Sequence, residues 1–407
     1  MKSVDQHLTD ILAGVKPLSP LDLQLLDAHG CILSEDVSSS VDVPPFDNSS
    51  MDGYAVRLED VASASETAPV RLPVVGDIAA GSTSAYSVQP GLTARIMTGA
   101  PLPAGAEAVV PIEWTDRGVS AVAITRAPID GENVRRKGED VRAGDVVLRA
   151  GARLGPAQIG LLAAVGRDRI KVRPKPRVVV LSPGSELVEP GSPVAPGQIN
   201  ESNSYVLTAA IREAGALAFR VGIVKDDQRL LLDTIEDQLI RADMVVTSGG
   251  VSVGAYDIVK EVLSRLGTVD FEAVAMQPGK PQGFGSIGPD NTPIFTLPGN
   301  PVSAYVSFEV FVRPAIRRML GVEPLHRTTV GALCTEALSS PAGRRQYTRA
   351  WLDVAEGRYV VRPVGGPGSH LLGDLAQANA FIVVPEDVTE IPAGQAVTVM
   401  VLERRLS

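Results

Sequence analysis

The segment TSGGVSVGAYD (residues 247–257) combines hydroxyl side chains, glycines and a carboxylate between a predicted strand and a predicted helix. Glycine lets a backbone approach a ligand closely and adopt positive φ angles. Successive backbone N–H groups in such a loop can bind phosphate. The residues that could contribute are Ser248, Gly249, Gly250, Ser252 and Gly254. Asp257 is either the N-cap of the next helix or a ligand for a divalent ion.

Three further polar, glycine-rich segments fall where strands are expected to end: SPGSEL (182–187), QPGKP (277–281) and LPGNPVSA (297–304). In a parallel sheet these ends would lie side by side along one edge, where ligands bind. Each segment also has an ordinary interpretation, such as a solvated loop lysine at Lys280 or a helix cap at Asn300. The candidate ligand contacts here are Lys280, Pro298, Gly299, Asn300 and Ser303.

Carboxylates accompany these loops. Glu186, Asp226 and Asp227 lie near predicted strand ends, as Asp257 does. A carboxylate cluster beside a phosphate-binding loop is typical of Mg²⁺, which takes few protein ligands and shares the rest with phosphates and water. We therefore expect Mg²⁺, or a similar divalent cation, bound by some of these four residues.

Candidate residues also occur outside the four loops. Asp52 lies in the turn-rich segment PPFDNSSMDGYAVR, and Thr98 follows an apolar strand in RIMTGAPLPAGA. Taken alone, both are ordinary turn residues. Arg345 and Arg349 in GRRQYTRAWL could contact anions, although an exposed arginine is the simpler interpretation of Arg345. No Ser-His-Asp or Cys-His set stands out, and the sequence has no CxxC or HxxxH spacing for zinc.

The elements that must position these residues alternate between strand and helix from about residue 177 to 320. This alternation predicts a doubly wound α/β sheet. A helix is predicted near the N-terminus, and short β-type runs fill residues 46–134. Residues 135–176 are expected to fold back on the N-terminal helix. The β patterns after residue 323 predict a small barrel or sandwich.

The composition limits the class of protein. The 407 residues carry a net charge of −9, which argues against a general nucleic-acid binder. The chain has two distant cysteines, no signal-peptide pattern and no apolar run long enough for a membrane span. We expect a cytoplasmic protein without nucleic-acid or membrane partners.

Seven motifs taken together resemble the molybdopterin molybdenumtransferase family and the corresponding domain of gephyrin. In chain order they are PPFDNSSMDGYAVR, RIMTGAPLPAGAEAVVP, RRKGEDVRAGDVVL, TSGGVSVGAYD, QPGKP, LPGNPVSA and LAQANAFIVVPE. The resemblance covers essentially the whole chain. Two departures stand out: Gln277 and Ala273 occupy positions where the family often has lysine. SPGSEL also lacks the carboxylate that the family has at Ser185.

The resemblance implies a multidomain α/β plus β fold in four parts. These are a discontinuous N-terminal dimerisation domain (1–43 plus 135–176), an inserted β-rich domain (44–134), an α/β molybdopterin-binding-like domain (177–322) and a C-terminal β domain (323–407). It also implies a homodimer, with the inserted domain of one subunit facing the α/β and C-terminal domains of the other. Other proteins of the cofactor pathway are further candidate partners.

The implied reaction inserts molybdenum from molybdate into adenylylated molybdopterin and releases AMP, with Mg²⁺. The family positions carry over onto Asp52, Thr98, Glu186, Asp257, Arg349 and Ser369, and onto either Asp226 or Asp227. Two alternatives remain: adenylyl transfer to molybdopterin, which belongs to a related single α/β domain, and a gephyrin-like scaffold. The additional domains argue against the first. The start of this sequence at the transferase-like region argues against the second.

Overall fold

The structure is a computed structural model that describes residues 1–82, 86–249 and 256–402, with the side chains of residues 256 and 257 excepted. Contacts divide the chain into two compact units, which we describe separately. The first comprises residues 1–21, 30–32 and 172–407, and the second residues 22–29 and 33–171. No helix in the described ranges is long and apolar enough to cross a membrane.

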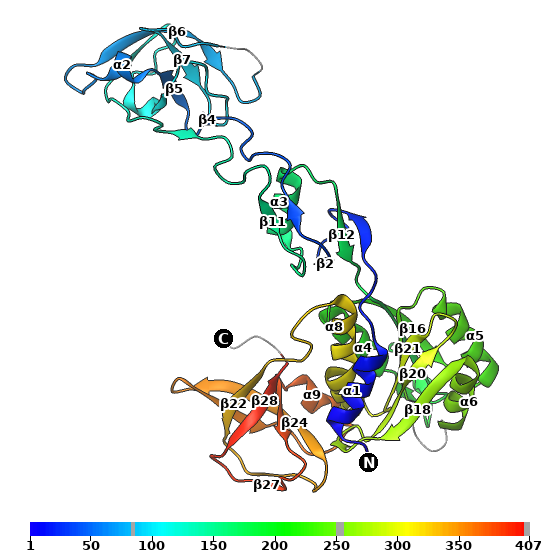
Figure 1. Cartoon of the computed structure of the whole chain (residues 1–407). Helices are drawn as coiled ribbons and strands as arrows, with labels where there is room; N and C mark the ends of the chain where they lie inside the picture. Colours follow the sequence, from blue (N-terminus) through cyan, green and yellow to red (C-terminus); the bar gives the residue numbers. More distant parts are fainter. Residues whose placement is uncertain (83–85, 250–255, 403–407) are drawn as a thin grey trace. The chain divides into compact units, whose positions relative to one another are not determined.

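A six-stranded sheet forms the centre of the first unit (Figure 1), with the strand order β16-β13-β17-β21-β20-β18. The strands are β13 (Arg177–Pro183), β16 (Leu217–Val224), β17 (Met244–Ser248), β18 (Gly267–Ala273), β20 (Pro281–Ile287) and β21 (Thr292–Leu297). The four strands from β16 to β21 are parallel, whereas β20 pairs antiparallel with both β21 and β18. The sheet is therefore mixed, with a parallel part that carries the glycine-rich loops.

Helices cover both faces of this sheet. They are α4 (Asn203–Glu213), α5 (Gln228–Leu239), α6 (Tyr256–Leu266), α7 (Pro301–Ser307) and α8 (Arg313–Leu320). Along β13, Val178 and Val180 join one hydrophobic cluster, while Val179 and Leu181 join another on the opposite face. A parallel strand buried on both faces needs such a continuous apolar run. The predicted doubly wound α/β architecture is confirmed.

The helix predicted over residues 301–320 is interrupted by a π-helical segment, Phe308–Val312, between α7 and α8. Pro314 lies in the first turn of α8. Proline has no N–H and cannot donate a regular helical hydrogen bond, so the chain takes a wider turn before it. All five residues of the π-helical segment are buried.

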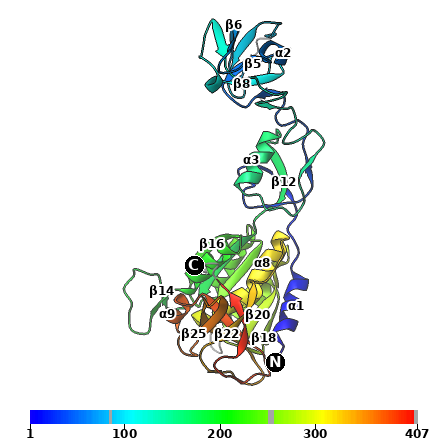
Figure 2. The same cartoon turned by 90° about the vertical axis from the view of Figure 1, so that its left-hand side faces the viewer.

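The N-terminal helix α1 (Val4–Gly14) belongs to the core of the first unit. Val4 and Ile11 on its buried face share a hydrophobic cluster with Ile316 and Met319 of α8. Figure 2 shows α1 running beside α8. Ser3 caps this helix by accepting a hydrogen bond from the Gln6 N–H at 3.1 Å. The predicted helical spacing thus buries this face against the helical layer of the α/β region.

The C-terminal part of the first unit is a closed β-barrel. Its strands are β22 (Thr329–Cys334), β24 (Arg345–Ala355), β25 (Arg358–Pro363), β26 (Ala380–Val384) and β28 (Ala396–Val401). The order is β24-β25-β22-β28-β26, and pairing of β26 with β24 closes the ring. Of the two predicted alternatives, the barrel is therefore the one formed. Smaller elements are β14 (Leu187–Val188), β15 (Ile199–Asn200), β19 (Met276–Gln277), β23 (Leu338–Ser339), α9 (Leu372–Ala376) and β27 (Glu390–Ile391).

The second unit contains a five-stranded sheet in the order β8-β5-β7-β6-β9. These strands are β5 (Gly53–Val56), β6 (Val70–Ile78), β7 (Thr93–Ile96), β8 (Ala108–Pro111) and β9 (Ala121–Ile124). Its smaller elements are β3 (Val37–Ser38), β4 (Asn48–Ser49), α2 (Leu58–Val61), the 3₁₀ turn Ile112–Trp114, β10 (Val134–Arg135), β11 (Val146–Leu148) and α3 (Pro156–Ala164). The strands β1 (Leu21–Gln24), β2 (Ile32–Leu33) and β12 (Arg169–Arg173) contain residues of both units. Residues 46–134 are thus rich in strands, as the sequence predicts.

Candidate active site

A pocket of about 330 Å³ opens where β13, β17 and β21 end. It is lined by residues from the segments 183–187, 199–203, 248–249 and 299–301, together with His370 and Leu372. The strand connections reverse direction between β13 and β17, because β16 lies on one side of β13 and β17 on the other. In open α/β sheets this switch point is where ligands bind.

The backbone at the end of β17 requires glycine. Gly249 has φ +93°, and its N–H donates to the Leu297 carbonyl at 2.9 Å. A Cβ on Gly299 would lie 3.7 Å from the Gly249 Cα, so the two loop backbones run close together. Gly250, Ser252 and Gly254 lie outside the described residues. Asp257 is in the first turn of α6, but its side chain is not described.

The QPGKP segment lies at the carboxyl ends of the parallel strands, as predicted, but it does so at the start of an antiparallel strand. It precedes β20 and does not follow a strand of the parallel sheet. Because β20 runs antiparallel to β21, with Gly283 opposite Thr296, the start of β20 lies at the carboxyl end of β21. Lys280 is exposed there. Gln277 belongs to β19, which pairs with the barrel strand β24, and Arg344 Nη1 donates to Gln277 Oε1 at 3.2 Å.

The barrel contributes to the pocket through the segment after β25. Ser369 Oγ accepts a hydrogen bond from Asn300 Nδ2 at 2.8 Å, and the Ser369 carbonyl accepts one from the Val302 N–H at 3.1 Å. Pro298 and Ser303 are buried on either side of Asn300. These contacts hold the barrel segment against the start of α7.

Arg349 lies beneath this segment and is only 5% exposed. Its guanidinium donates to the Gly368 carbonyl at 3.0 Å and to the Gly366 carbonyl. Burial lowers the pKa of Arg349. Its observed contacts make Arg349 a support for the backbone that carries Ser369.

The acidic residues predicted for a metal separate into different environments. Glu186 is exposed and lines the pocket. Asp226 accepts a hydrogen bond from the Ser185 N–H at 3.0 Å, and Asp227 caps α5 by accepting from the Leu230 N–H at 2.8 Å. Within the described ranges, no three His, Cys, Asp or Glu side chains gather as a metal-binding group. Glu186 lines the pocket, whereas Asp226 and Asp227 are not among its lining residues.

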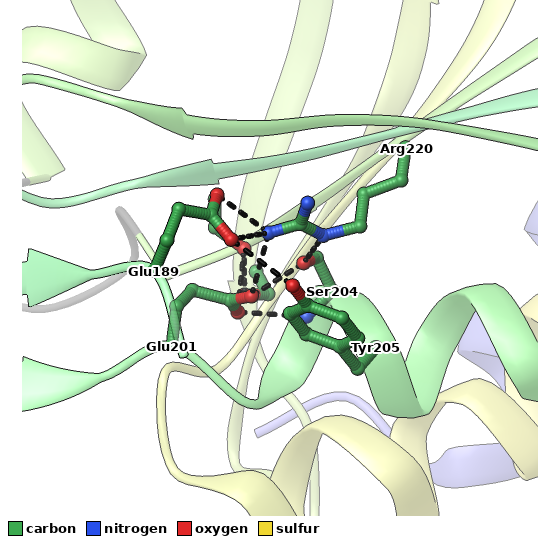
Figure 3. A network of polar contacts seen from close by, with 7 residues as sticks. Glu189, Glu201, Ser204, Tyr205 and Arg220 are labelled. Atoms are coloured by element: carbon green, nitrogen blue, oxygen red, sulfur yellow. Dashed lines mark hydrogen bonds and ion pairs between the residues drawn. The ribbon is translucent and has the colours of Figure 1, made fainter. Parts of the chain in front are cut away.

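A buried carboxylate that the sequence analysis missed forms one wall of the pocket. Glu201 is 2% exposed and accepts a hydrogen bond from the Ser204 N–H at 2.7 Å (Figure 3). It also accepts one from Ser182 Oγ at 3.0 Å. Ser204 Oγ also donates to it. Its position directly before the first turn of α4 was the available signal, since acidic residues are favoured at helix N-termini.

Arg220 connects this wall to the surface. Its guanidinium donates to both Glu189 oxygens at 2.6 Å and to Ser204 Oγ at 2.6 Å, and lies 3.7 Å from a Glu201 oxygen (Figure 3). The Tyr205 ring stacks on it, with its centroid 4.1 Å from the Arg220 guanidinium carbon. The hydrogen bond from Arg220 holds the pKa of Glu189 below its usual range. The buried Glu201 is thus balanced by a cation and several donors.

Asp52 and Thr98 form a pair in the second unit. The Thr98 N–H and Oγ both donate to Asp52 Oδ1, at 2.7 and 2.9 Å. The pairing of β5 with β7, with Gly53 opposite Ile96, brings the two residues together. The backbone N–H of Thr98 is the main cause of a lowered pKa at Asp52, which therefore stays ionised.

Comparison with family models gives matches to three consecutive segments of the chain. Family models match residues 2–166 (MoeA N-terminal region, domain I and II), 179–318 (probable molybdopterin binding domain) and 332–402 (MoeA C-terminal region, domain IV). Molybdopterin molybdenumtransferase 2 of Mycobacterium tuberculosis is 46% identical, over 97% of this chain and 98% of that protein. This chain belongs to the molybdopterin molybdenumtransferase family. A family member from a Nostoc species is 40% identical over 94% of this chain and 90% of its own.

Solved structures of the molybdopterin molybdenumtransferase family agree with the fold. Two structures of molybdopterin biosynthesis MoeA proteins from Pyrococcus horikoshii give TM-scores of 0.79 and 0.73, at 35% and 28% identity. Both comparisons cover 98% of this chain and 99% or more of the other. The predicted family resemblance is therefore confirmed over nearly the whole chain.

Proposed function

We propose that this chain inserts molybdenum from molybdate into adenylylated molybdopterin and releases AMP. Two dithiolene sulfurs replace two oxygens of molybdate, which leave as water after protonation, so the oxidation state of molybdenum does not change. One water adds across the phosphoanhydride, giving AMP and the phosphomonoester of the cofactor. The observation that carries the proposal is the pocket at the switch point of the sheet, in a chain 46% identical to a molybdopterin molybdenumtransferase.

In this proposal the pocket binds the adenylylated substrate through backbone as well as side chains. Residues 250–254, which lie outside the described ranges, would hold phosphate through their N–H groups. Asn300 and Ser369, already joined by a hydrogen bond, and the exposed Lys280 would contact the oxyanions. Arg349 would act by fixing the backbone beside Ser369. Mg²⁺, bound by Glu186 and Asp257 with Asp226 as a further candidate, would polarise the phosphoanhydride.

We further propose that the chain is a homodimer and that Asp52 and Thr98 complete the site of the partner subunit. Asp52 is exposed, and both hydrogen bonds from Thr98 end on its Oδ1. This leaves Oδ2 as the oxygen available to a ligand. The lowered pKa keeps this carboxylate charged for such a contact.

The first test is Asp257→Asn in the full-length protein, measured as molybdate-dependent AMP release from adenylylated molybdopterin. We expect a loss of at least about 100-fold. Asp290→Asn is a suitable control because Asp290 follows β20, away from the carboxyl ends of the parallel strands. Unchanged turnover by the Asp257 variant would remove this residue from the mechanism.

The second test combines two inactive variants. Differently tagged Asp52→Asn and Asp257→Asn subunits are co-expressed and the heterodimer is purified. If the two residues act in one site from different subunits, each heterodimer has one intact site and regains about half of the wild-type activity. If they act from the same subunit, both sites stay defective. A monomeric wild-type protein would contradict the dimer directly.

The alternative function is adenylyl transfer to molybdopterin. It is tested by mixing the protein with molybdopterin and ATP in the absence of molybdate. Accumulation of the adenylylated product would replace the insertion proposal by this alternative. A gephyrin-like scaffold is the third candidate, and a protein inactive in both assays that still captures non-pathway proteins would support it.

A further inference from the structure

A chain of hydrogen bonds runs from the buried network to the wall of the pocket. Glu201 accepts from Ser182 Oγ at 3.0 Å, and Ser182 Oγ lies 3.1 Å from Ser248 Oγ. Ser248 is 3% exposed and lines the pocket. All three residues are buried, so each hydroxyl hydrogen has to find a partner inside the protein or on a ligand.

Counting hydrogens fixes the direction of this chain. An ionised carboxylate only accepts, whereas a serine hydroxyl has one hydrogen and two lone pairs. Glu201 is surrounded by donors from Ser182 and Ser204 and faces Arg220 at 3.7 Å. The single Ser182 hydrogen therefore points to Glu201. The remaining contact at 3.1 Å is satisfied when the Ser248 hydroxyl donates to Ser182.

We propose that Glu201 is a positioning residue that turns the Ser248 hydroxyl so that its lone pairs face the pocket. Ser248 then accepts a hydrogen bond from the substrate. Its partner is an N–H group, such as the ring amide or amino group of a pterin, and not a phosphate oxygen. The inference deepens the proposed function and rests on it for the identity of the pterin.

This assignment changes the role expected for Ser248. Instead of donating a hydrogen bond to phosphate, it accepts one from the pterin ring and so favours that ring. A phosphate oxygen opposite these lone pairs would be repelled, while a ring N–H would be attracted. Within the network, Ser204 also receives a hydrogen bond from Arg220 Nε at 2.6 Å. Its own hydrogen is therefore directed to Glu201, which is consistent with the same direction along the chain.

The test measures two affinities for each purified full-length variant: 6-hydroxymethylpterin by fluorescence titration and AMP by calorimetry. Ser248→Ala removes the acceptor, and Ser182→Ala frees the Ser248 hydrogen to point into the pocket. We expect both to weaken pterin binding about tenfold while AMP binding stays within about twofold. The ratio of the two affinities reports the hydrogen-bond direction. A general loosening of the fold would weaken both ligands alike and leave this ratio unchanged.

Glu201→Gln provides the rescue. The Ser204 N–H requires an acceptor at the Oε1 position, so the amide oxygen stays there and Ser182 keeps its direction. We expect pterin affinity within about threefold of wild type for Glu201→Gln, and the tenfold loss for Glu201→Ala. Unchanged pterin binding in Ser248→Ala and Ser182→Ala, or equal losses of pterin and AMP, would overturn the inference. If the wild-type protein releases AMP but does not bind 6-hydroxymethylpterin, the inference about Ser248 is also overturned. The proposed function then remains intact.

Discussion

The pocket of the first unit and the Asp52–Thr98 pair of the second both place carboxylates at the ends of strands, but different partners hold them. Glu201 in the pocket is 2% exposed, accepts hydrogen bonds from Ser182 and Ser204 and lies 3.7 Å from the Arg220 guanidinium. Asp52 is exposed and is held by two hydrogen bonds from Thr98 to one oxygen.

The difference separates structural from reactive carboxylates. A charge as buried as Glu201 persists only when donors surround it, and these donors occupy its lone pairs. An exposed carboxylate such as Asp52 keeps an oxygen for a ligand. The buried Glu201 is therefore expected to shape the site, and the exposed Asp52 to act on the substrate. Four measurements test this division.

The largest effect is expected from Glu201→Ala. Removing one member of a buried charged group leaves the Ser204 N–H and the hydroxyls of Ser182 and Ser204 without their acceptor, so the unfolding free energy should fall by about 3 kcal/mol. Chemical denaturation measures it. The matched control is Glu189→Ala, which removes the half-buried partner of the same Arg220 and should cost less than the Glu201 variant, about 1 kcal/mol. Equal losses for the two variants would contradict the distinction between them.

Asp52→Asn should reduce AMP release at least about 100-fold, close to 2.7 kcal/mol of activation energy, with little change in stability. Asp47 provides the control within the same motif, because it accepts hydrogen bonds from Arg136 Nη1 at 2.9 Å and the Lys137 N–H at 2.7 Å. Asp47→Asn should keep its activity within about threefold and lose stability instead. If Asp47→Asn lost activity and Asp52→Asn lost stability instead, Asp47 would be the reactive carboxylate and Asp52 the structural one.

Thr98→Val should have a smaller effect, because it removes one of the two hydrogen bonds to Asp52 and keeps the main-chain one. A reduction in AMP release of about tenfold or less is expected. The pKa of Asp52 is lowered in the folded protein, so the active carboxylate persists as pH falls until that lowered pKa is reached. Loss of the hydroxyl raises this pKa, and the acid limb of the pH–rate profile should move to higher pH. If the acid limb of the profile does not move, ionisation of Asp52 does not control the rate.

The smallest effect is expected at Asp227. As the N-cap of α5 it should contribute about 1 kcal/mol to stability and nothing to turnover. Asp227→Ala therefore should lower the melting temperature slightly while AMP release stays the same. Asp226→Ala loosens the Ser185 loop beside Glu186 and should lower turnover more. A greater loss of activity in the Asp227 variant would reverse this assignment.

Much of the fold follows from periodicity that the sequence carries locally. The apolar run of β13 and the helical spacing of α1 predicted their burial, because one strand or helix decides which side chains share a face. The locations of Glu186, Ser248 and Asn300 near the pocket also followed from placing loops at strand ends. QPGKP was placed after a strand of the parallel sheet, when it precedes the antiparallel β20. Strand direction depends on distant pairing that local patterns do not contain.

The sequence by itself determined the family, the doubly wound pattern and the glycines that the loops need. Only the tertiary structure decided the environment of each polar side chain. It buried Glu201 among donors from residues 182, 204 and 220, and turned Arg349 toward the backbone of Gly366 and Gly368. The physical reason is that a charge acquires its role from partners brought together by folding, whereas glycine and apolar residues act on the backbone and the core through their own type.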